Sequence, residues 1–562
     1  MKKIQLQLKN LSVRYPDKTL ACDKVSFRLE TGKCLAVVGE SGSGKSTIAR
    51  AILNLLPKGT ERTGSILFNE EELVGISEKE MRQIRGTRIG FISQDPNAAC
   101  NPVLSVFRHV AEAWYAHGLT FVPDKIITAF SSMGIRHSKE QAGRYPHEWS
   151  GGMLQRAEIT AASIHHPSVI IADEPTSALD KDLADSILRL IVSLDSAILL
   201  ISHDLSLVSD FADDIAVCYA GQLVEMGSVT RIANHPRHPY TQALMNAVYK
   251  KGGLLPEPLS GSVPDLKQVS SACSFAPRCR YKMEKCLNEA PRLTQGVACH
   301  LNDKTGLQQW EPTIDLLNES KEPTFNKSKL VLELIGISKR FKESSIADPI
   351  LDGINLALKT GEIIGVCGSS GSGKSTLLKI VSGIEIPDTG MIRYGNHPLW
   401  KYKGKRVIRC LPRNGYTMSV FQNPYSSLDQ RWPIWRSITE PAMAAHCKTR
   451  PSNSHRKLMA ARLLKNAGLS QLNGSERPSE LSVGQCQRVC ILRALFAKPT
   501  VILADEPTSA LDVTSAAGIY KLFKDYACQG IAMIIVSHDE TGLHSFCDSM
   551  FRLSNGKLSR IC

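Results

Sequence analysis

The hydrophobic residues of this chain fall into short runs, of which "AILLI" at 197–201 is among the longest. Short continuous runs are typical of strands buried on both faces of a parallel sheet. The amino terminus differs, because "MKKIQLQLKNLSVRY" alternates Leu6 and Leu8 with polar residues, and this alternation predicts a first strand. No stretch approaches about 18 consecutive apolar residues, so we expect neither a membrane-spanning helix nor a secretory signal.

Two of the apolar runs, "CLAVV" at 34–38 and "IIGVC" at 363–367, are each followed by a glycine-rich loop and a helix-like segment. This order predicts a phosphate-binding P-loop, in which backbone N–H groups surround the phosphates and a lysine reaches their outer oxygens. The loop serines, Ser46 and Ser375, are the predicted Mg²⁺ ligands. The predicted nucleotide-binding residues of the two loops are Gly39, Ser41, Gly42, Gly44, Lys45, Ser46 and Thr47, and Gly368, Ser370, Gly371, Gly373, Lys374, Ser375 and Thr376.

A pair of acidic residues follows a later apolar strand in each half, in "IIADEPTSALD" at 170–180 and "ILADEPTSALD" at 502–512. The first acid, Asp173 or Asp505, is placed to hold the hydration shell of the metal. The second, Glu174 or Glu506, is placed to orient or deprotonate a water for attack on the γ-phosphate. The acids could instead only cap the next helix, but the whole motif recurs intact in both halves. Together these motifs predict hydrolysis at the γ-phosphate.

The repeated motifs indicate a tandem duplication. Lys374 lies 329 residues after Lys45, and the later motifs keep this offset to within six residues. We therefore expect an α/β fold with two P-loop nucleotide-binding domains in tandem, each with a mainly parallel sheet. The expected segments are a first domain at 1–232, a cysteine-containing extension at 233–303, a linker at 304–329 and a second domain at 330–562.

These motifs resemble those of the ATP-binding cassette (ABC) ATPases, and the resemblance covers nearly the whole chain. It implies a helical subdomain in each cassette. Gln94 in "FISQDP" and Gln422 in "VFQNP" resemble the glutamines that contact the metal and sense a transmembrane partner. The remaining implied positions are two histidines near the γ-phosphate, two aspartates that close the D-loops and two aromatic residues that stack on adenine: His203 and His538, Asp180 and Asp512, and Tyr15 and Phe341.

A further motif occurs in two forms, "EWSGGMLQR" at 148–156 and "ELSVGQCQR" at 480–488. In the ABC family this signature loop completes the ATP site of the opposite cassette. Val483 replaces a glycine, and we expect its branched side chain to weaken the site built on Lys45 and Glu174. Alternatively, this position tolerates a side chain that points away from the nucleotide. The nucleotide-binding residues that the resemblance implies are Ser150, Gly151 and Gly152, and Ser482, Gly484 and Gln485.

The segment between the two cassettes narrows the resemblance. It contains "HPRHPYTQALMNAV" at 235–248, "PLSGSVPDL" at 258–266, "CSFAPRCRYKMEKC" at 273–286 and "VACHL" at 297–301. These stretches resemble the extension that follows the cassettes of oligopeptide, dipeptide and nickel importers. The second cassette is not followed by such an extension, so the chain is similar to fused pairs in which two cassette subunits became one polypeptide.

Four of the 16 cysteines lie in this extension and could share a ligand. Their spacing is wider than that of paired zinc ligands, and the lack of a secretory signal argues against disulfides. Four thiolates can hold an iron–sulfur cluster, and the resemblance implies a [4Fe–4S] site. Another metal, or no ligand at all, is the alternative. The four residues are Cys273, Cys279, Cys286 and Cys299.

The net charge of +14 is compatible with nucleic acid, an anionic membrane surface or nucleotide phosphates. The basic stretch "KYKGKRVIRCLPR" at 401–413 is interpreted as a solvated face. A twin-cassette protein that acts on ribosomes would join its cassettes with a long charged helix, and a DNA-repair cassette protein would carry CxxC zinc modules. Neither feature is found in the sequence.

The resemblance therefore implies the motor of an importer, with one chain supplying both cassettes. Its expected cofactors are ATP and Mg²⁺. Its expected partners are two different transmembrane permease subunits and an extracytoplasmic solute-binding protein, without nucleic acid. Such a motor is peripheral to the cytoplasmic face of the bacterial inner membrane. The cargo could be a peptide, nickel or a metal chelate, because the binding protein and the permeases select it.

Overall fold

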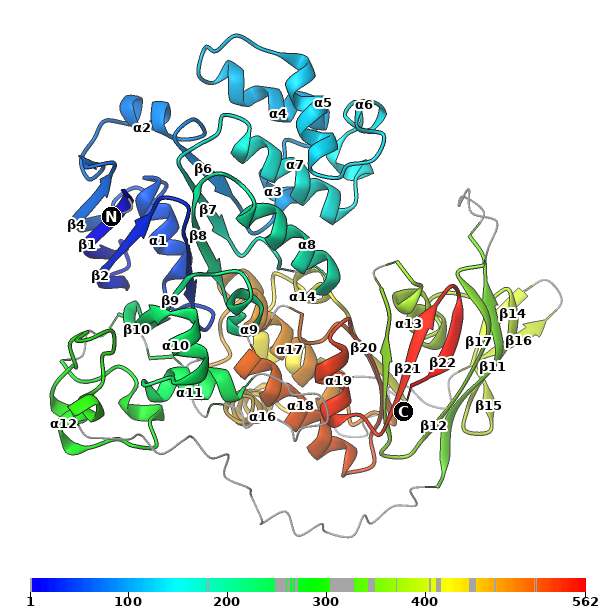
Figure 1. The fold of residues 1–562 in the computed structure, drawn as a ribbon. Coiled ribbons are helices and arrows are strands. Elements are labelled where there is room, and N and C mark those ends of the chain that lie inside the picture. Colours follow the sequence, from blue (N-terminus) through cyan, green and yellow to red (C-terminus); the bar gives the residue numbers. More distant parts are fainter. Residues whose placement is uncertain are drawn as a thin grey trace. The chain divides into compact units, whose positions relative to one another are not determined.

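The computed structural model (Figure 1) describes most of the chain, which divides into two compact units: Met1–Asn246 with Val263–Glu311, and Ala247–Ser262 with Pro312–Cys562. The predicted linker lies almost wholly outside the described residues, and so do Ser370, Asp180 and Asp512. The residues without a described placement are 1–2, 178, 180, 248–258, 260–262, 265, 268–270, 304–327, 342–348, 370, 404–405, 411–415, 444–450, 470–471, 510, 512 and 562.

The first unit contains a six-stranded sheet in the order β10-β9-β3-β8-β7-β6. Strands β6, β7, β8, β3 and β9 pair in parallel, whereas β10 joins β9 in antiparallel orientation. Strands β3, β7 and β8 are buried along their whole length, which confirms the predicted parallel core. The bounds are β3 (Cys34–Val38), β6 (Ile89–Ile92), β7 (Val169–Asp173), β8 (Ala197–Ser202), β9 (Asp214–Tyr219) and β10 (Gln222–Ser228).

A second sheet of the first unit is antiparallel, in the order β2-β1-β4-β5. The predicted amino-terminal strand is β1, and its leucines pack in the same core as helix α1 and the parallel strands. Its alternating pattern follows from having one face in this core. The bounds are β1 (Ile4–Arg14), β2 (Leu20–Glu30), β4 (Glu61–Phe68), β5 (Glu71–Glu72), α1 (Lys45–Ile52) and α2 (Glu78–Ile84).

Between β6 and β7 the chain forms a helical subdomain, drawn in cyan in Figure 1. Its helices share a core of their own that includes Trp114, Phe130 and Trp149. The helical subdomain expected from the family resemblance is thus present. The helices are α3 (Pro96–Ala99), α4 (Val106–Tyr115), α5 (Pro123–Ser132), α6 (Ser138–Gln141) and α7 (Gly151–Ser163), followed after β7 by α8 (Lys181–Val192), α9 (Leu205–Ser209), α10 (Val229–Asn234) and α11 (Pro239–Asn246).

The extension returns to the first unit as short turns around α12 (Glu284–Asn288). The Met226 N–H donates a hydrogen bond to the Gly296 carbonyl, and the Ala298 N–H donates to the Val224 carbonyl. The extension therefore lies along the outer edge of β10. Its 3₁₀ turns are Ala276–Arg278 and His300–Asp303.

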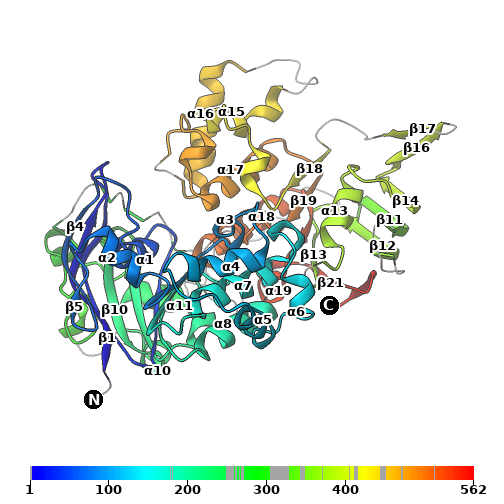
Figure 2. The same cartoon turned by 90° about the horizontal axis from the view of Figure 1, so that it is seen from above.

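The second unit repeats the plan, with a six-stranded sheet β18-β19-β20-β13-β21-β22 and a four-stranded sheet β12-β11-β14-β15. Figure 2 shows α15, α16 and α17 grouped as its helical subdomain. The strands are β11 (Leu330–Lys339), β12 (Leu351–Lys359), β13 (Ile363–Cys367), β14 (Thr389–Tyr394), β15 (His397–Pro398), β18 (Thr417–Val420), β19 (Val501–Asp505), β20 (Ala532–Val536), β21 (Ser549–Ser554) and β22 (Lys557–Arg560). The helices are α13 (Lys374–Val381), α14 (Pro424–Ser427), α15 (Ile434–Ile438), α16 (Asn453–Asn466), α17 (Val483–Phe496), α18 (Val513–Ala527) and α19 (Glu540–Phe546).

The basic stretch at 401–413 contributes to a two-stranded hairpin, β16 (Trp400–Lys403) with β17 (Arg406–Arg409). Lys401 and Arg409 are exposed, in keeping with a solvated face, but the sequence analysis had not foreseen the strands. Among the described residues, no helix combines the length and apolar character needed to cross a membrane.

Candidate ATP-binding sites

The first P-loop joins β3 to α1 and encloses a buried lysine. Gly44 caps α1 with a φ of 99°, and a Cβ atom there would lie 2.1 Å from the carbonyl oxygen of Ala21, so only glycine fits. Lys45 Nζ donates hydrogen bonds to the carbonyl oxygens of Gly39 and Glu40, at 2.8 and 2.9 Å. The loop thus holds an ammonium group beside the N-terminus of α1, where free backbone N–H groups favour a phosphate.

The second P-loop, between β13 and α13, has the same construction. Gly373 caps α13 with a φ of 100°. Lys374 Nζ donates to the carbonyl oxygens of Gly368 and Ser369, at 2.7 and 2.9 Å. Each unit therefore has its own phosphate-binding loop, as the sequence predicts.

The predicted metal-site acids end buried strands next to the loop serines. Asp173, at the end of β7, is 4% exposed and accepts a hydrogen bond of 2.9 Å from Ser46 Oγ. Burial raises the pKa of Asp173, and the bond from Ser46 partly opposes this shift. Asp505 shows the same balance between burial and a hydrogen bond from Ser375. A serine hydroxyl beside a carboxylate is a suitable pair of ligands for Mg²⁺ or its hydration shell.

In the first unit, Glu174 joins two of the predicted site residues. Its Oε2 atom lies 3.1 Å from Gln94 Nε2 and 3.2 Å from His203 Nδ1. Burial lowers the pKa of His203, but the hydrogen bond and the charge of Glu174 raise it more, so that the net shift is upward. Glu174 itself has a φ of 49°, a left-handed conformation that is unusual for a side chain of this size.

The second unit keeps the glutamate and the histidine but not the glutamine bond. Glu506 also has a φ of 49°, and its Oε2 atom lies 2.8 Å from His538 Nδ1. Gln422 is exposed, and within the described residues of this unit no hydrogen bond joins its side chain to Glu506. The two candidate sites therefore differ in how the glutamine approaches the glutamate.

The predicted adenine-stacking residues have unequal surroundings. The Tyr15 hydroxyl lies 3.0 Å from Thr47 Oγ1, so this ring is tied to the first P-loop. Phe341 is exposed, and Lys339 Nζ lies 5.4 Å from the centre of its ring. The adenine-stacking roles of Tyr15 and Phe341 both stay predictions.

The signature loops form the N-termini of α7 and α17. Ser150 caps α7, and Ser482 caps α17 in a reciprocal arrangement with Gln485. A side chain at Gly152 would come within 2.6 Å of Leu183 Cδ2, whereas one at Gly151 would meet nothing within 4 Å. Within its own unit, a side chain at Gly152 would therefore require Leu183 to shift, whereas one at Gly151 would meet open space. Val483 replaces the first glycine and leaves its side chain 43% exposed.

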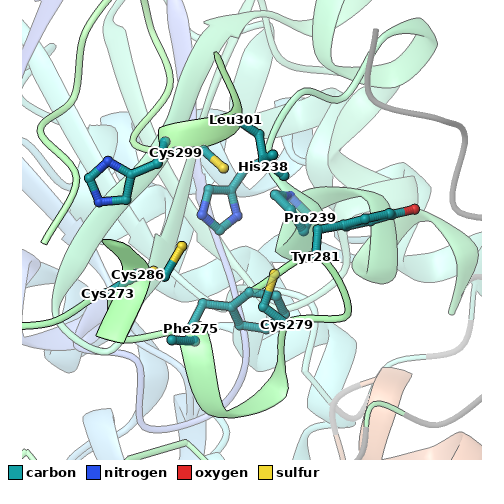
Figure 3. Close-up of a pocket in the computed structure, with 11 residues that line it drawn as sticks. His238, Pro239, Cys273, Phe275, Cys279, Tyr281, Cys286, Cys299 and Leu301 are labelled. Carbon is teal, nitrogen blue, oxygen red and sulfur yellow. The ribbon is translucent and has the colours of Figure 1, made fainter. Parts of the chain in front are cut away.

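The four cysteines of the extension line one pocket of the first unit (Figure 3). Burial raises the pKa of the Cys279 thiol to about 12 and also raises the pKa values of Cys273 and Cys299. His238, which the sequence analysis missed, lines the same pocket, and burial lowers its pKa to about 3. No described group of three or more histidine, cysteine or acidic side chains is arranged closely enough to hold a single metal ion.

These features define a tandem nucleoside-triphosphate hydrolase, with two P-loops, each beside an aspartate that ends a strand and a glutamate–histidine pair. The family model "ABC transporter" matches residues 22–177 and 351–509, and the model "Oligopeptide/dipeptide transporter, C-terminal region" matches residues 224–286. The chain therefore belongs to the ABC transporter family, with two cassettes fused in one polypeptide. It uses ATP and Mg²⁺ and is an ATPase.

The similarity to known relatives covers nearly the whole length of this chain. The oligopeptide transport ATP-binding protein OppD of Mycobacterium tuberculosis is 33% identical over 95% of this chain and 91% of its own. The glutathione import ATP-binding protein GsiA of Pectobacterium atrosepticum is 32% identical over 95% of this chain and 82% of its own. A solved complex of archaeal ribosomal stalk protein aP1 and ribosome recycling factor aABCE1 covers 98% of this chain and 89% of the matched chain, with a TM-score of 0.56 and 18% identity. At that identity the likeness shows the fold alone.

Proposed function

We propose that this protein is the ATP-hydrolysing motor of an importer whose cargo is an oligopeptide or a small peptide such as glutathione. The observation that carries the proposal is the combination, in one chain, of two cassettes and an extension that matches the oligopeptide/dipeptide transporter C-terminal region. The names of the full-length relatives favour peptides over nickel or a metal chelate.

In this proposal the lysines of the two P-loops bind the outer phosphate oxygens of ATP. Ser46 and Ser375 ligate Mg²⁺, and Asp173 and Asp505 hold its hydration shell. The backbone N–H groups of the loop glycines and of the helix N-termini cradle the phosphates. The buried Asp173 and the half-buried Asp505 each interact with the serine of their own P-loop, which supports this assignment.

Glu174 and Glu506 orient or deprotonate the attacking water, and His203 and His538 hold these carboxylates in place. The short distance between each Glu Oε2 and its histidine Nδ1 supports this assignment. Gln94 and Gln422 link the sites to the transmembrane partner. In this proposal the two glutamines represent two positions relative to the catalytic glutamate: Gln94 is hydrogen-bonded to Glu174, and Gln422 is exposed.

We further propose two different permease subunits and an extracytoplasmic solute-binding protein as partners, with the chain peripheral at the cytoplasmic face of the bacterial inner membrane. Two unlike cassettes in one chain present two unlike surfaces, which suits a heterodimeric permease. The ribosome-acting alternative has no support beyond the shared fold.

The four pocket cysteines supply the kind of ligand that an iron–sulfur cluster uses. Their side chains line one pocket, and a four-iron cluster takes one thiolate from each cysteine. When bound, such a cluster joins four points of the extension through iron–thiolate bonds. We propose Cys273, Cys279, Cys286 and Cys299 as its ligands.

The importer proposal is tested by peptide uptake in cells that carry the permeases and the binding protein. Lys45→Ala combined with Lys374→Ala should abolish uptake, because both P-loops lose their phosphate-binding ammonium, while circular dichroism stays unchanged. Lys79→Ala, at an exposed lysine of α2, is the matched control and should leave uptake intact. Uptake that persists in the double variant would contradict the proposal.

A further inference from the structure

The first P-loop contains an acidic residue whose partner comes from the extension. Glu40 is the second residue of the loop, and Arg278 binds its carboxylate with both terminal nitrogens, at 2.7 and 3.0 Å. Both side chains are only 5% exposed. A buried two-point pair between guanidinium and carboxylate fixes distance and orientation together.

Aromatic side chains from three elements enclose this ion pair. The Arg278 guanidinium lies over the ring of Tyr219, 5.7 Å from its centre. Tyr240 of α11 packs against Tyr219, with ring centres 4.6 Å apart, and against Phe275 of the extension, at 5.5 Å. The pair is shielded from water, so the loss of one partner is more damaging than it would be in an exposed ion pair.

The same residue of the loop is held at its backbone. The Glu40 N–H donates a hydrogen bond of 2.9 Å to the Tyr240 hydroxyl, and its carbonyl oxygen accepts the bond from Lys45 Nζ. A shift of Glu40 would thus move the group that positions the phosphate-binding lysine. Arg278 lies one residue before Cys279, so the pocket of four cysteines connects through this arginine to the lysine of the ATP site.

The second P-loop has no such connection among the described residues. Ser369 occupies the position of Glu40 and is exposed, although its carbonyl oxygen accepts the same bond from Lys374. The loop geometry can therefore form without an ion pair. The Glu40–Arg278 ion pair is therefore a feature of the first loop that is not needed to form a P-loop.

We propose that Arg278 is a positioning residue for the first ATP site, acting through Glu40, and that it makes ATP binding at this site dependent on the cysteine-containing extension. Removal of the guanidinium takes the two-point ion pair away from the buried Glu40 carboxylate. The carboxylate must then turn toward water and draw the loop with it, or become protonated. Either change alters the surroundings of Lys45 but leaves Lys374 untouched. The inference rests on the ATPase activity and not on the importer proposal.

The test measures ATP binding to the full chain by isothermal titration calorimetry with Mg²⁺, without permeases or cargo. Lys374→Ala silences the second site, so the titration reports the first, and Lys45→Ala gives the converse background. We expect Arg278→Gln to weaken ATP binding at the first site by about tenfold, and Arg278→Lys to weaken it less, because lysine keeps the charge but not the two-point geometry. Arg292→Gln, at an exposed arginine of the same segment, is the matched control.

A double variant distinguishes positioning through Glu40 from general damage. Glu40→Ser introduces the residue of the second loop but removes the buried carboxylate that binds Arg278, so it too should weaken the first site. Glu40→Ser with Arg278→Gln removes both charges and should restore binding to within about threefold of the unmodified chain. Equal weakening at both sites, no weakening in Arg278→Gln, or additive losses in the double variant would each overturn the proposal.

Discussion

Replacing Val483 by glycine gives the second signature loop the Ser-Gly-Gly sequence of the first, and we expect this change to raise ATP hydrolysis at one site. The backbone angles of the two capping serines are nearly equal, −68° and 159° at Ser482 against −70° and 155° at Ser150. Valine therefore leaves the fold of its own loop unchanged. Any effect of its side chain, which is 43% exposed, comes from what it meets outside its unit.

The expected effect of Val483 is judged by comparison with Gly151, the glycine at the same position of the first signature loop. A Cβ atom at Gly151 would meet nothing within 4 Å, so the first loop leaves its outer surface open for a phosphate. The family resemblance implies that a signature loop completes the ATP site of the opposite cassette, and on that basis we expect the valine loop to serve the site built on Lys45. Loss of one charge-assisted hydrogen bond there corresponds to about 1–3 kcal/mol, or about 5- to 150-fold in an equilibrium constant.

The assay is steady-state ATP hydrolysis by the full chain assembled with its permeases. Glu506→Gln should lower the ATPase rate roughly 10²-fold or more, because the remaining intact site is the one expected to contain Val483. Glu174→Gln should leave a higher residual rate. In the Glu506→Gln background, Val483→Gly should raise the residual rate about fivefold or more. Gly151→Val in the Glu174→Gln background is the reciprocal control and should lower it.

Two results would refute this reasoning. If both glutamate variants lose activity equally, or if Glu174→Gln loses more, the valine does not weaken its site. If Val483→Gly leaves the residual rate unchanged, the side chain points away from the nucleotide, as the alternative interpretation holds.

Three further predictions concern stability and the cofactor. Gly152→Val should lower the free energy of unfolding by about 1 kcal/mol in thermal denaturation, because the Leu183 side chain must shift to make room. Gly151→Val should change it by less than about 0.5 kcal/mol; equal effects would contradict the packing argument. Because the pKa of His203 is raised in the folded protein, its pairing with Glu174 stabilises the fold fully below pH about 6.5, and this stabilisation is lost as pH rises through the raised pKa. In nucleotide-free denaturation at a series of pH values, His203→Gln should therefore reduce the dependence of the free energy of unfolding on pH. An unchanged pH profile would count against the pairing. Protein purified without oxygen should be brown and contain about four irons and four sulfides per chain, and colourless, iron-free protein would exclude the cluster.

The repeated architecture and the chemistry of the two sites could be predicted because their signals are local. A P-loop is nine consecutive residues between a strand and a helix, and the backbone conformation needed at Gly44 or Gly373 restricts the sequence directly. Continuous apolar runs likewise indicated the buried parallel strands, since both faces of such strands are covered.

The ion pair of Glu40 with Arg278 could not be predicted, because the two residues are 238 positions apart and no periodicity connects them. The same holds for His238, which reaches the cysteine pocket only through the fold of the extension. The β16–β17 hairpin was missed for another reason. Its many basic residues indicate exposure to solvent, but exposed two-stranded ribbons and exposed loops share that composition.

The position of the extension along β10 affects how the first cassette could be isolated. β10 is the edge strand of its sheet, and the backbone bonds to Gly296 and Ala298 occupy part of that edge. The buried carboxylate of Glu225 on this strand also accepts hydrogen bonds from the N–H groups of Arg237 and His238. A fragment that stops at residue 232 would uncover this edge and leave an acid short of donors, which favours self-association by strand pairing. The extension thus covers an edge at which strands of two copies could otherwise pair, whatever its cysteines bind.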